Sequence, residues 1–200
     1  MTELQQELAA VAARLIAEEG LPWGAAKQRA VRELGLGSRV ALPDNDQVED
    51  ALREHLALFQ ADSQPAELRQ LRLLALRWME RLAAFEPLLV GAAWRGTANR
   101  LSDLHLDLFS DDPKAVEIAL LNAGETPEPG APTRDARGMQ HNTLVIWLAP
   151  PPGFQQPVAL QMNVQSHQAQ RGSLLPDARG TRPRGNTAQL RSLLEESAPP

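Results

Sequence analysis

Three polar residues alternate along one short segment near the middle of the chain. Asp103, His105 and Asp107 are separated by leucines, and side chains two residues apart on a strand project to the same face. Carboxylates that share a face can hold Mg²⁺, which prefers oxygen ligands and commonly bridges to substrate phosphates. The spacing therefore predicts Asp103 and Asp107 as candidate catalytic residues, and Asp103, His105 and Asp107 as candidate ligands of Mg²⁺ or Mn²⁺.

A glycine-containing turn precedes this segment. Glycines let the backbone approach a phosphate closely, and the following turn can present N–H donors to it. Two arginines flank the turn, and guanidinium groups pair well with phosphate oxygens. The candidate residues for binding a nucleotide or phosphate are therefore Gly91, Arg95, Gly96 and Arg100.

Each of these residues also has an ordinary structural explanation. Asp103 can simply start a strand, and His105 in an alternating strand can be a packed or a surface residue. Asp107 can belong to a solvated strand end. Arg95 and Arg100 can pair with Asp103 or Asp107 instead of a phosphate.

The elements that position these residues differ between the two parts of the chain. Residues 2–85 are expected to be helical, because apolar residues recur at spacings of three and four. The first expected helix ends at Gly20, and the second covers Ala25–Leu34. The third begins after Pro43-Asp44, and the fourth begins at Gln64-Pro65. The last of these helices carries Arg69, Arg72, Arg77 and Arg81, which we interpret as a solvated basic face.

After Glu86-Pro87 the pattern becomes mixed. The expected strands are 88–94, 103–109, 143–148 and 157–164, and the expected helices are 113–121 and 186–196. This order predicts an α+β protein in which an N-terminal helical region packs on a small mixed β-sheet. The expected parts are a helical region (1–86), an α/β core (87–168) and an Arg/Gly-containing tail with a short C-terminal helix (169–200).

Composition narrows the classes of function. The chain has no Cys, which excludes disulfides, thiolate metal sites and a Cys nucleophile. Its formal net charge of −5 argues against a globally basic nucleic-acid binder. No apolar stretch approaches the roughly 18 residues of a membrane span, and the polar N-terminus does not resemble a secretory signal. We therefore expect a cytoplasmic protein without a membrane partner.

The segment 91–109 resembles the nucleotidyltransferase superfamily, whose fold is shared by DNA polymerase β and the minimal nucleotidyltransferases. That family has a Gly-Ser or Gly-Gly turn, often followed by Arg-Gly, and then Ser-Asp-x-Asp on a strand. Gly91, Arg95-Gly96 and Ser102-Asp103 match this pattern. The resemblance adds Ser102 to the candidate residues for binding a nucleotide or phosphate. It also implies a sheet of nucleotidyltransferase type and metal-dependent transfer from a nucleotide, with Mg²⁺ or Mn²⁺ as the cofactor.

The chain departs from that family at three places. Ala92 stands where the family has Ser or Gly, and His105 stands where it has the second carboxylate. The third carboxylate is missing, because the strands expected at 143–148 and 157–164 contain no Asp or Glu; their nearest polar candidate is Asn163. We therefore expect a nucleotidyltransferase-like protein with weakened or lost catalysis that binds a nucleotide or a phosphorylated ligand.

A second resemblance covers most of the chain and is to a group of proteobacterial proteins. It rests on the segments 45–49, 96–97, 102–106, 116–122 and 177–180, and it implies a bacterial protein without implying an activity. The tail, with Arg179, Arg182 and Arg184, suits contact with RNA or an acidic protein. The alternative hypothesis is therefore a non-enzymatic interaction module that uses its helices and this tail.

Overall fold

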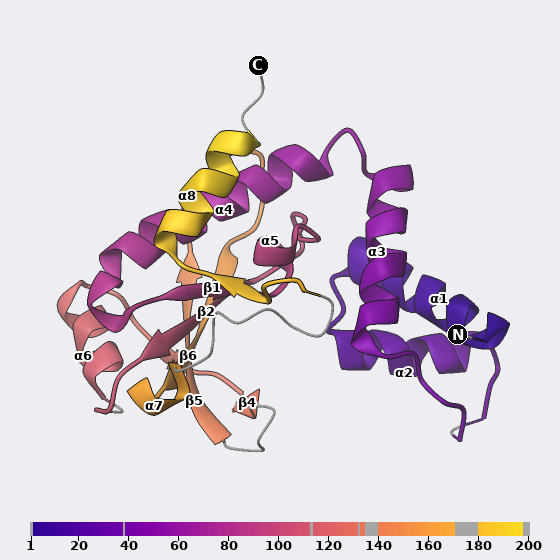
Figure 1. Ribbon diagram of the computed structural model, residues 1–200, viewed down its shortest axis with the longest axis horizontal. Helices are drawn as coiled ribbons and strands as arrows, with labels where there is room; N and C mark the ends of the chain where they lie inside the picture. Colours follow the sequence, from indigo (N-terminus) through magenta and orange to yellow (C-terminus); the bar gives the residue numbers. More distant parts are fainter. Residues whose placement is uncertain are drawn as a thin grey trace. The chain divides into compact units, whose positions relative to one another are not determined.

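A computed structural model gives the fold (Figure 1) and describes residues 2–37, 39–112, 114–131, 133–134, 140–170 and 180–197. The chain is α+β, as the sequence predicts. It divides into two compact units. A helical unit contains Met1–Ala66 and Asn99–Ser102, and a sheet unit contains Glu67–Ala98 and Asp103–Pro200. This division assigns most of the fourth helix and the C-terminal helix to the unit that holds the sheet.

The helical unit is built from α1 (Glu3–Glu19), α2 (Trp23–Glu33) and α3 (Asn45–Phe59). Thr2 and Asp44 cap α1 and α3 through reciprocal capping boxes, because each side chain accepts a hydrogen bond from the backbone N–H three residues on. Gly20 ends α1 in the left-handed conformation, at the residue where the sequence predicts the end. Apolar side chains, including Leu8 and Leu52, are fully buried along these helices.

The short segment Asn99–Ser102 belongs to this helical unit although it lies between two elements of the sheet unit. The Asn99 side chain is buried and donates hydrogen bonds to the Ala17 carbonyl at 2.7 Å and to Gln60 Oε1 at 3.1 Å. Ser102 Oγ accepts a hydrogen bond from the Asn99 backbone N–H at 3.0 Å. These bonds satisfy a buried amide side chain, which would be costly to leave unpaired, and they fix the loop against its helices.

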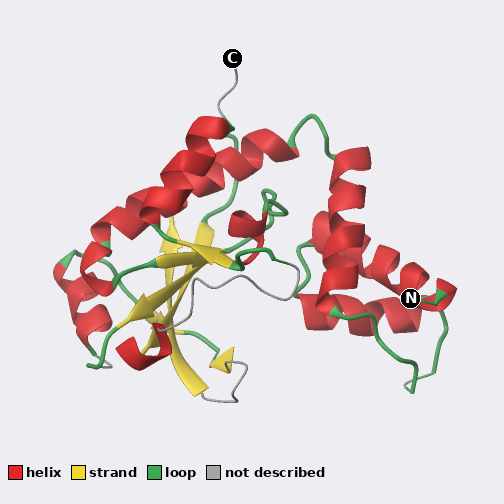
Figure 2. Cartoon of the chain, viewed as in Figure 1, coloured by secondary structure: helices red, strands yellow, loops and turns green. Residues whose placement is uncertain are grey.

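The sheet of the second unit has the strand order β3-β5-β6-β2-β1-β7, with β4 paired to β5. The strands are β1 (Leu88–Val90), β2 (Leu104–Phe109), β3 (Glu128–Pro129), β4 (Thr133–Arg134), β5 (Gln140–Leu148), β6 (Val158–Gln165) and β7 (Arg184–Gly185). The pair β2–β6 is parallel and the other pairs are antiparallel, so the sheet is mixed, as expected. Figure 2 shows these strands among the helices.

Helices α4 (Gln64–Arg81), α6 (Ala115–Asn122) and α8 (Thr187–Glu196) bury apolar residues in the core of this unit. The other helical segments are short: the 3₁₀ turn η1 (Ala83–Phe85), α5 (Gly91–Arg95) and α7 (His167–Gln170). Leu71 and Met79 of α4 and Leu190 of α8 share one core with Leu104, Leu106 and Leu108 of β2. Helices α4 and α8 lie side by side (Figure 1), and Arg191 of α8 forms an ion pair with Glu80 of α4 at 2.6 Å.

Two expected element boundaries need correction. The apolar run 88–94 is not one strand: β1 ends at Val90, and Gly91 opens the helix α5. Residues 180–197 do not behave as a separate tail, since β7 pairs with β1 and α8 contributes to the core. The other expected strands and helices agree with the structure within a few residues, and Pro113, where a helix was expected to begin, lies outside the described residues. Two short segments, η1 and α7, were not expected.

Candidate functional site

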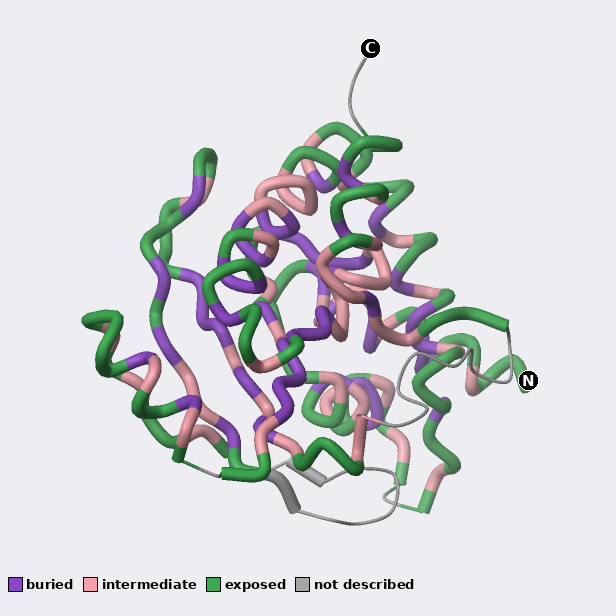
Figure 3. Tube along the Cα trace, turned by 60° about the vertical axis from the view of Figure 1, so that its left-hand side comes forward, coloured by how far each residue is buried: buried purple, intermediate pink, exposed green. Residues whose placement is uncertain are grey.

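Strand β2 places its polar residues on one face of the sheet. Leu104, Leu106 and Leu108 are buried in the core, and strict alternation turns His105 and Asp107 to the opposite face. Figure 3 shows the mixture of buried and less buried positions along the strands. On the neighbouring strand, Gln161 lies opposite His105 and Asn163 lies opposite Asp107. We call Asp103, His105, Asp107, Gln161 and Asn163 the polar face.

Asp107 is buried and both of its carboxylate oxygens are hydrogen-bonded. Arg184 Nη1 of β7 donates to Asp107 Oδ2 at 2.7 Å, and Asn163 Nδ2 donates to Asp107 Oδ1 at 3.2 Å. Thr143 Oγ1 of β5 in turn donates to Asn163 Oδ1 at 3.1 Å. The charge of Asp107 is therefore balanced from within the chain, by an arginine that sequence analysis assigned to an RNA-binding or protein-binding tail.

Asp103 differs from Asp107 in its surroundings. It lies just before β2, is exposed, and accepts a hydrogen bond from Gln161 Nε2 at 2.9 Å on Oδ2. An exposed carboxylate keeps lone pairs for water or for a cation that arrives with a ligand. Of the two carboxylates predicted on this face, Asp103 is the one that can serve an external ligand.

His105 lies between the two carboxylates. Burial lowers the pKa of His105 below its ordinary 6.5, because desolvation disfavours the charged imidazolium; the nearby charges of Asp103 and Asp107 act in the opposite direction. His105 is therefore mainly neutral at pH 7. In that form one ring nitrogen donates and the other accepts a hydrogen bond.

The lowered pKa of His105 gives the protein a pH-dependent stability. Below pH 6.5 the unfolded chain takes up a proton at this position more readily than the folded chain, so the free energy of unfolding should fall between about pH 7 and pH 5. His105→Gln should remove this part of the decrease. Urea unfolding of both proteins across that range measures the difference between their free energies of unfolding. Parallel pH profiles for the two proteins would contradict the assignment.

The turn expected to approach a phosphate lies directly against His105. Gly91 has a φ of 72°, in the left-handed region, and a Cβ added there would meet His105 Cδ2 at 3.5 Å. Gly96, with a φ of 90°, ends α5 just after Arg95. The structure therefore brings Gly91 to the polar face at the start of α5.

Helix α5 is held by a buried arginine of α4. Arg72 Nε donates to the Ala93 carbonyl at 2.9 Å, and Arg72 Nη2 donates to the Trp94 carbonyl at 3.2 Å. The interpretation of Arg72 as part of a solvated basic face is therefore wrong. The C-terminal carbonyls of a helix lack hydrogen-bond donors within the helix. The Arg72 guanidinium supplies two such donors to α5.

Two of the predicted phosphate-binding residues fall in the other unit. Arg100 and Ser102 belong to the helical unit with Asn99, and the Ser102 hydroxyl is used within its own loop. Gly91, Arg95 and Gly96 belong to the sheet unit. Arg179 lies outside the described residues, while the Arg182 carbonyl accepts a hydrogen bond from Trp94 Nε1 at 2.8 Å.

The donor set does not fit a resident metal ion. Within the described residues, no group of three or more His, Asp or Glu side chains is arranged to hold one. Asp103, His105 and Asp107 share a face but are spread along the strand at about 6–7 Å per two residues, and Asp107 already faces Arg184.

No helix in the described part of the chain is long and apolar enough to cross a membrane.

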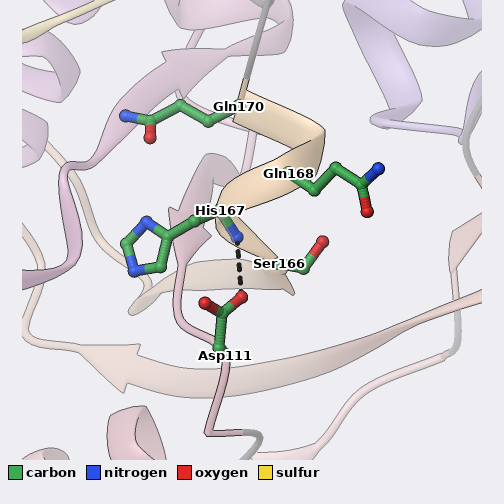
Figure 4. A pocket seen from close by; sticks show the side chains of 5 residues that line it. All are labelled: Asp111, Ser166, His167, Gln168 and Gln170. Carbon is green, nitrogen blue, oxygen red and sulfur yellow. Dashed lines mark hydrogen bonds between the residues drawn. The ribbon is translucent and has the colours of Figure 1, made fainter.

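A hollow of about 630 Å³ lies beside α7 and is lined by Asp111, Ser166, His167, Gln168 and Gln170 (Figure 4). Asp111 Oδ1 accepts a hydrogen bond from the His167 backbone N–H at 3.1 Å. The side chains of Gln168 and Gln170 point in different directions (Figure 4). The lining therefore offers no set of groups that converge on one ligand atom.

Three residues on or beside the polar face are not predicted by the sequence patterns. Gln161 belongs to the face, while Thr143 and Arg184 contact its members Asn163 and Asp107. One signal was present: polar Gln161 and Asn163 alternate within the otherwise apolar segment of β6, as Asp103, His105 and Asp107 do before and within β2. Two strands with the same alternation predict a polar face shared by both.

No family model matches the chain. No curated protein matches it either.

Proposed function

We propose that this chain is a nucleotidyltransferase-like protein with weakened or lost catalysis, which binds a nucleotide or another phosphorylated ligand on the polar face of its sheet. The observation that carries the proposal is the position of Gly91. This left-handed glycine lies against His105, in the order strand, glycine turn, short helix and strand that the resemblance implies. A backbone turn beside polar side chains is a suitable place for phosphate oxygens.

The surroundings of the carboxylates support the loss of catalysis. Two-metal chemistry needs several carboxylates that bridge the ions. Asp107 faces Arg184 and Asn163. On the two neighbouring strands, the positions in register with Asp107 are Asn163 of β6 and Thr143 of β5, and neither is a carboxylate. Asp103 alone remains exposed at this face among these residues.

The same groups suit binding without turnover. Gln161 and neutral His105 offer hydrogen-bond donors beside the Gly91 turn. Mg²⁺ often binds through one carboxylate and the phosphates of its nucleotide, so a Mg²⁺–nucleotide complex would need only Asp103 from the protein. The alternative hypothesis, an RNA-binding or protein-binding module, would use Arg184, which Asp107 already engages; we therefore favour the nucleotide.

Thermal unfolding with ATP and Mg²⁺ or Mn²⁺ tests this function. A ligand present at 100 times its Kd adds about 2.7 kcal/mol to stability, which raises the Tm by roughly 5 to 10 °C for a chain of this length. Asp103→Ala should abolish the rise, since it removes the exposed carboxylate. Glu117→Ala, which removes an exposed carboxylate from α6, should leave the rise unchanged. If no nucleotide raises the Tm of the wild-type protein, the proposal is wrong.

A further inference from the structure

A large aromatic side chain on β5 is exposed to solvent. Trp147 is 62% exposed, whereas its neighbours Ile146 and Leu148 are 2% and 5% exposed and belong to the core. Successive residues of a strand point to opposite faces. The alternation therefore assigns the Trp147 indole to the side of the sheet that carries the polar face.

The strand register places Trp147 in line with Asp103. Trp147 pairs with Ala159 of β6, and the parallel pair Leu104–Leu160 brings Asp103, one residue earlier, beside Ala159. Neighbouring strands lie about 4.8 Å apart, so the Cα atoms of Trp147 and Asp103 are about 10 Å apart. Ala159 between them has a small side chain, so no bulky group at that position separates the indole from Asp103.

Trp147 also lies where one side of the sheet is open. Strand β3 pairs with β5 only at Leu144 and Val145, so β5 has no described neighbour on that side at Trp147. Within the described part of the chain, the indole has no hydrogen-bond partner and no ring partner. One flat surface is therefore available to a planar group.

We propose that Trp147 stacks on the base of a nucleotide whose Mg²⁺-bound phosphates lie at Asp103, Gln161 and His105. This inference rests on the proposed function and extends it from a phosphate to the whole nucleotide. A base and its phosphates are joined by one sugar, and the distance between Trp147 and Asp103 lies within the span of a single nucleotide. Stacking on an indole accepts any base, because every base has a π-face, so the site selects nucleotides as a class.

The polar neighbours of Trp147 favour a nucleotide over an apolar partner. Gln161 is two residues from Ala159 on β6, diagonal to Trp147 and on the same face. Its amide already donates to Asp103 and can also pair with the edge of a base or a sugar hydroxyl. A second copy of the chain or an apolar peptide would leave these polar groups covered and unpaired, which is unfavourable.

Binding of two probes to three proteins tests the assignment. Titration calorimetry with Mg²⁺ would measure the Kd of ATP and of inorganic triphosphate for the wild type, Trp147→Ala and Trp147→Phe. Loss of a base–aromatic stack weakens binding by about 1–3 kcal/mol, which corresponds to a roughly 5- to 150-fold higher Kd. Trp147→Ala should show this increase for ATP and no change for triphosphate, and Trp147→Phe should recover most of the affinity.

The outcomes separate the two proposals. A wild-type protein that binds neither probe overturns the proposed function and this inference together. A wild type that binds ATP, with an unchanged Kd in Trp147→Ala or an equal loss for both probes, overturns only the stacking role. Leu121→Ala removes an exposed apolar side chain of α6 and should not change either Kd. A concentration-dependent dimer that Trp147→Ala dissociates would assign the indole to a second copy and overturn the inference.

Discussion

Arg184→Ala should destabilise the sheet unit by about 3 kcal/mol, the lower end of the range for breaking a buried ion pair. The Asp107 side chain keeps 7% of its exposure and that of Arg184 keeps 28%, and their nearest atoms are 2.7 Å apart. Removal of the guanidinium leaves a buried carboxylate whose remaining side-chain partner is Asn163. Urea unfolding followed by circular dichroism measures the loss.

Two further variants separate the ion pair from ordinary packing. Arg184→Lys keeps a positive charge but lacks the planar guanidinium, so it should lose less stability than Arg184→Ala. The double variant Asp107→Asn with Arg184→Met removes both charges and keeps similar volumes. It should be more stable than Arg184→Ala, because replacing both members of a buried pair is often nearly neutral. A loss below about 0.5 kcal/mol for Arg184→Ala would show that the contact behaves as a surface ion pair.

The partnership of Arg184 and Asp107 shows what local sequence patterns leave out. The polar alternation of β2 is a local signal, and it correctly predicts that His105 and Asp107 share a face. Arg184 lies 77 residues away, and its pairing depends on β7 joining the edge of the sheet beside β1. A strand of two residues has no periodicity to detect, so the sequence pattern suggests a tail at this place.

The contrast between local and long-range interactions also explains which helices and strands can be predicted from the sequence, including the segment 88–94. Capping residues act within one turn, so the starts of α1 and α3 can be predicted from Thr2 and Asp44 alone. A short apolar run does not distinguish a buried strand from a buried helix, and the left-handed φ of Gly91 decides where β1 ends. The burial of Arg72 depends on the position of α5 against α4, which helix periodicity does not contain.

Gly185→Ala should also cost about 3 kcal/mol, at the upper end of the usual range for overpacking. A Cβ at Gly185 would overlap the ring of Trp94. The indole is itself held in place, because its Nε1 donates to the Arg182 carbonyl at 2.8 Å. Either the ring or β7 must therefore move, and Gly185 is paired with Leu89 of β1. Since Arg184 is the adjacent residue, movement of β7 would also weaken its ion pair with Asp107.

A double-mutant cycle with Trp94 tests the steric cause. Trp94→Ala removes the ring and should lower stability by itself; adding Gly185→Ala to that variant should then cost much less than it does in the wild type. The expected coupling is roughly 1–3 kcal/mol, as found for residues in direct contact. Gly24→Ala is the matched control, because nothing lies within 4 Å of its added Cβ and alanine is a better helix former than glycine. Equal losses from Gly185→Ala with and without Trp94 would show that the indole is not what excludes a side chain at Gly185.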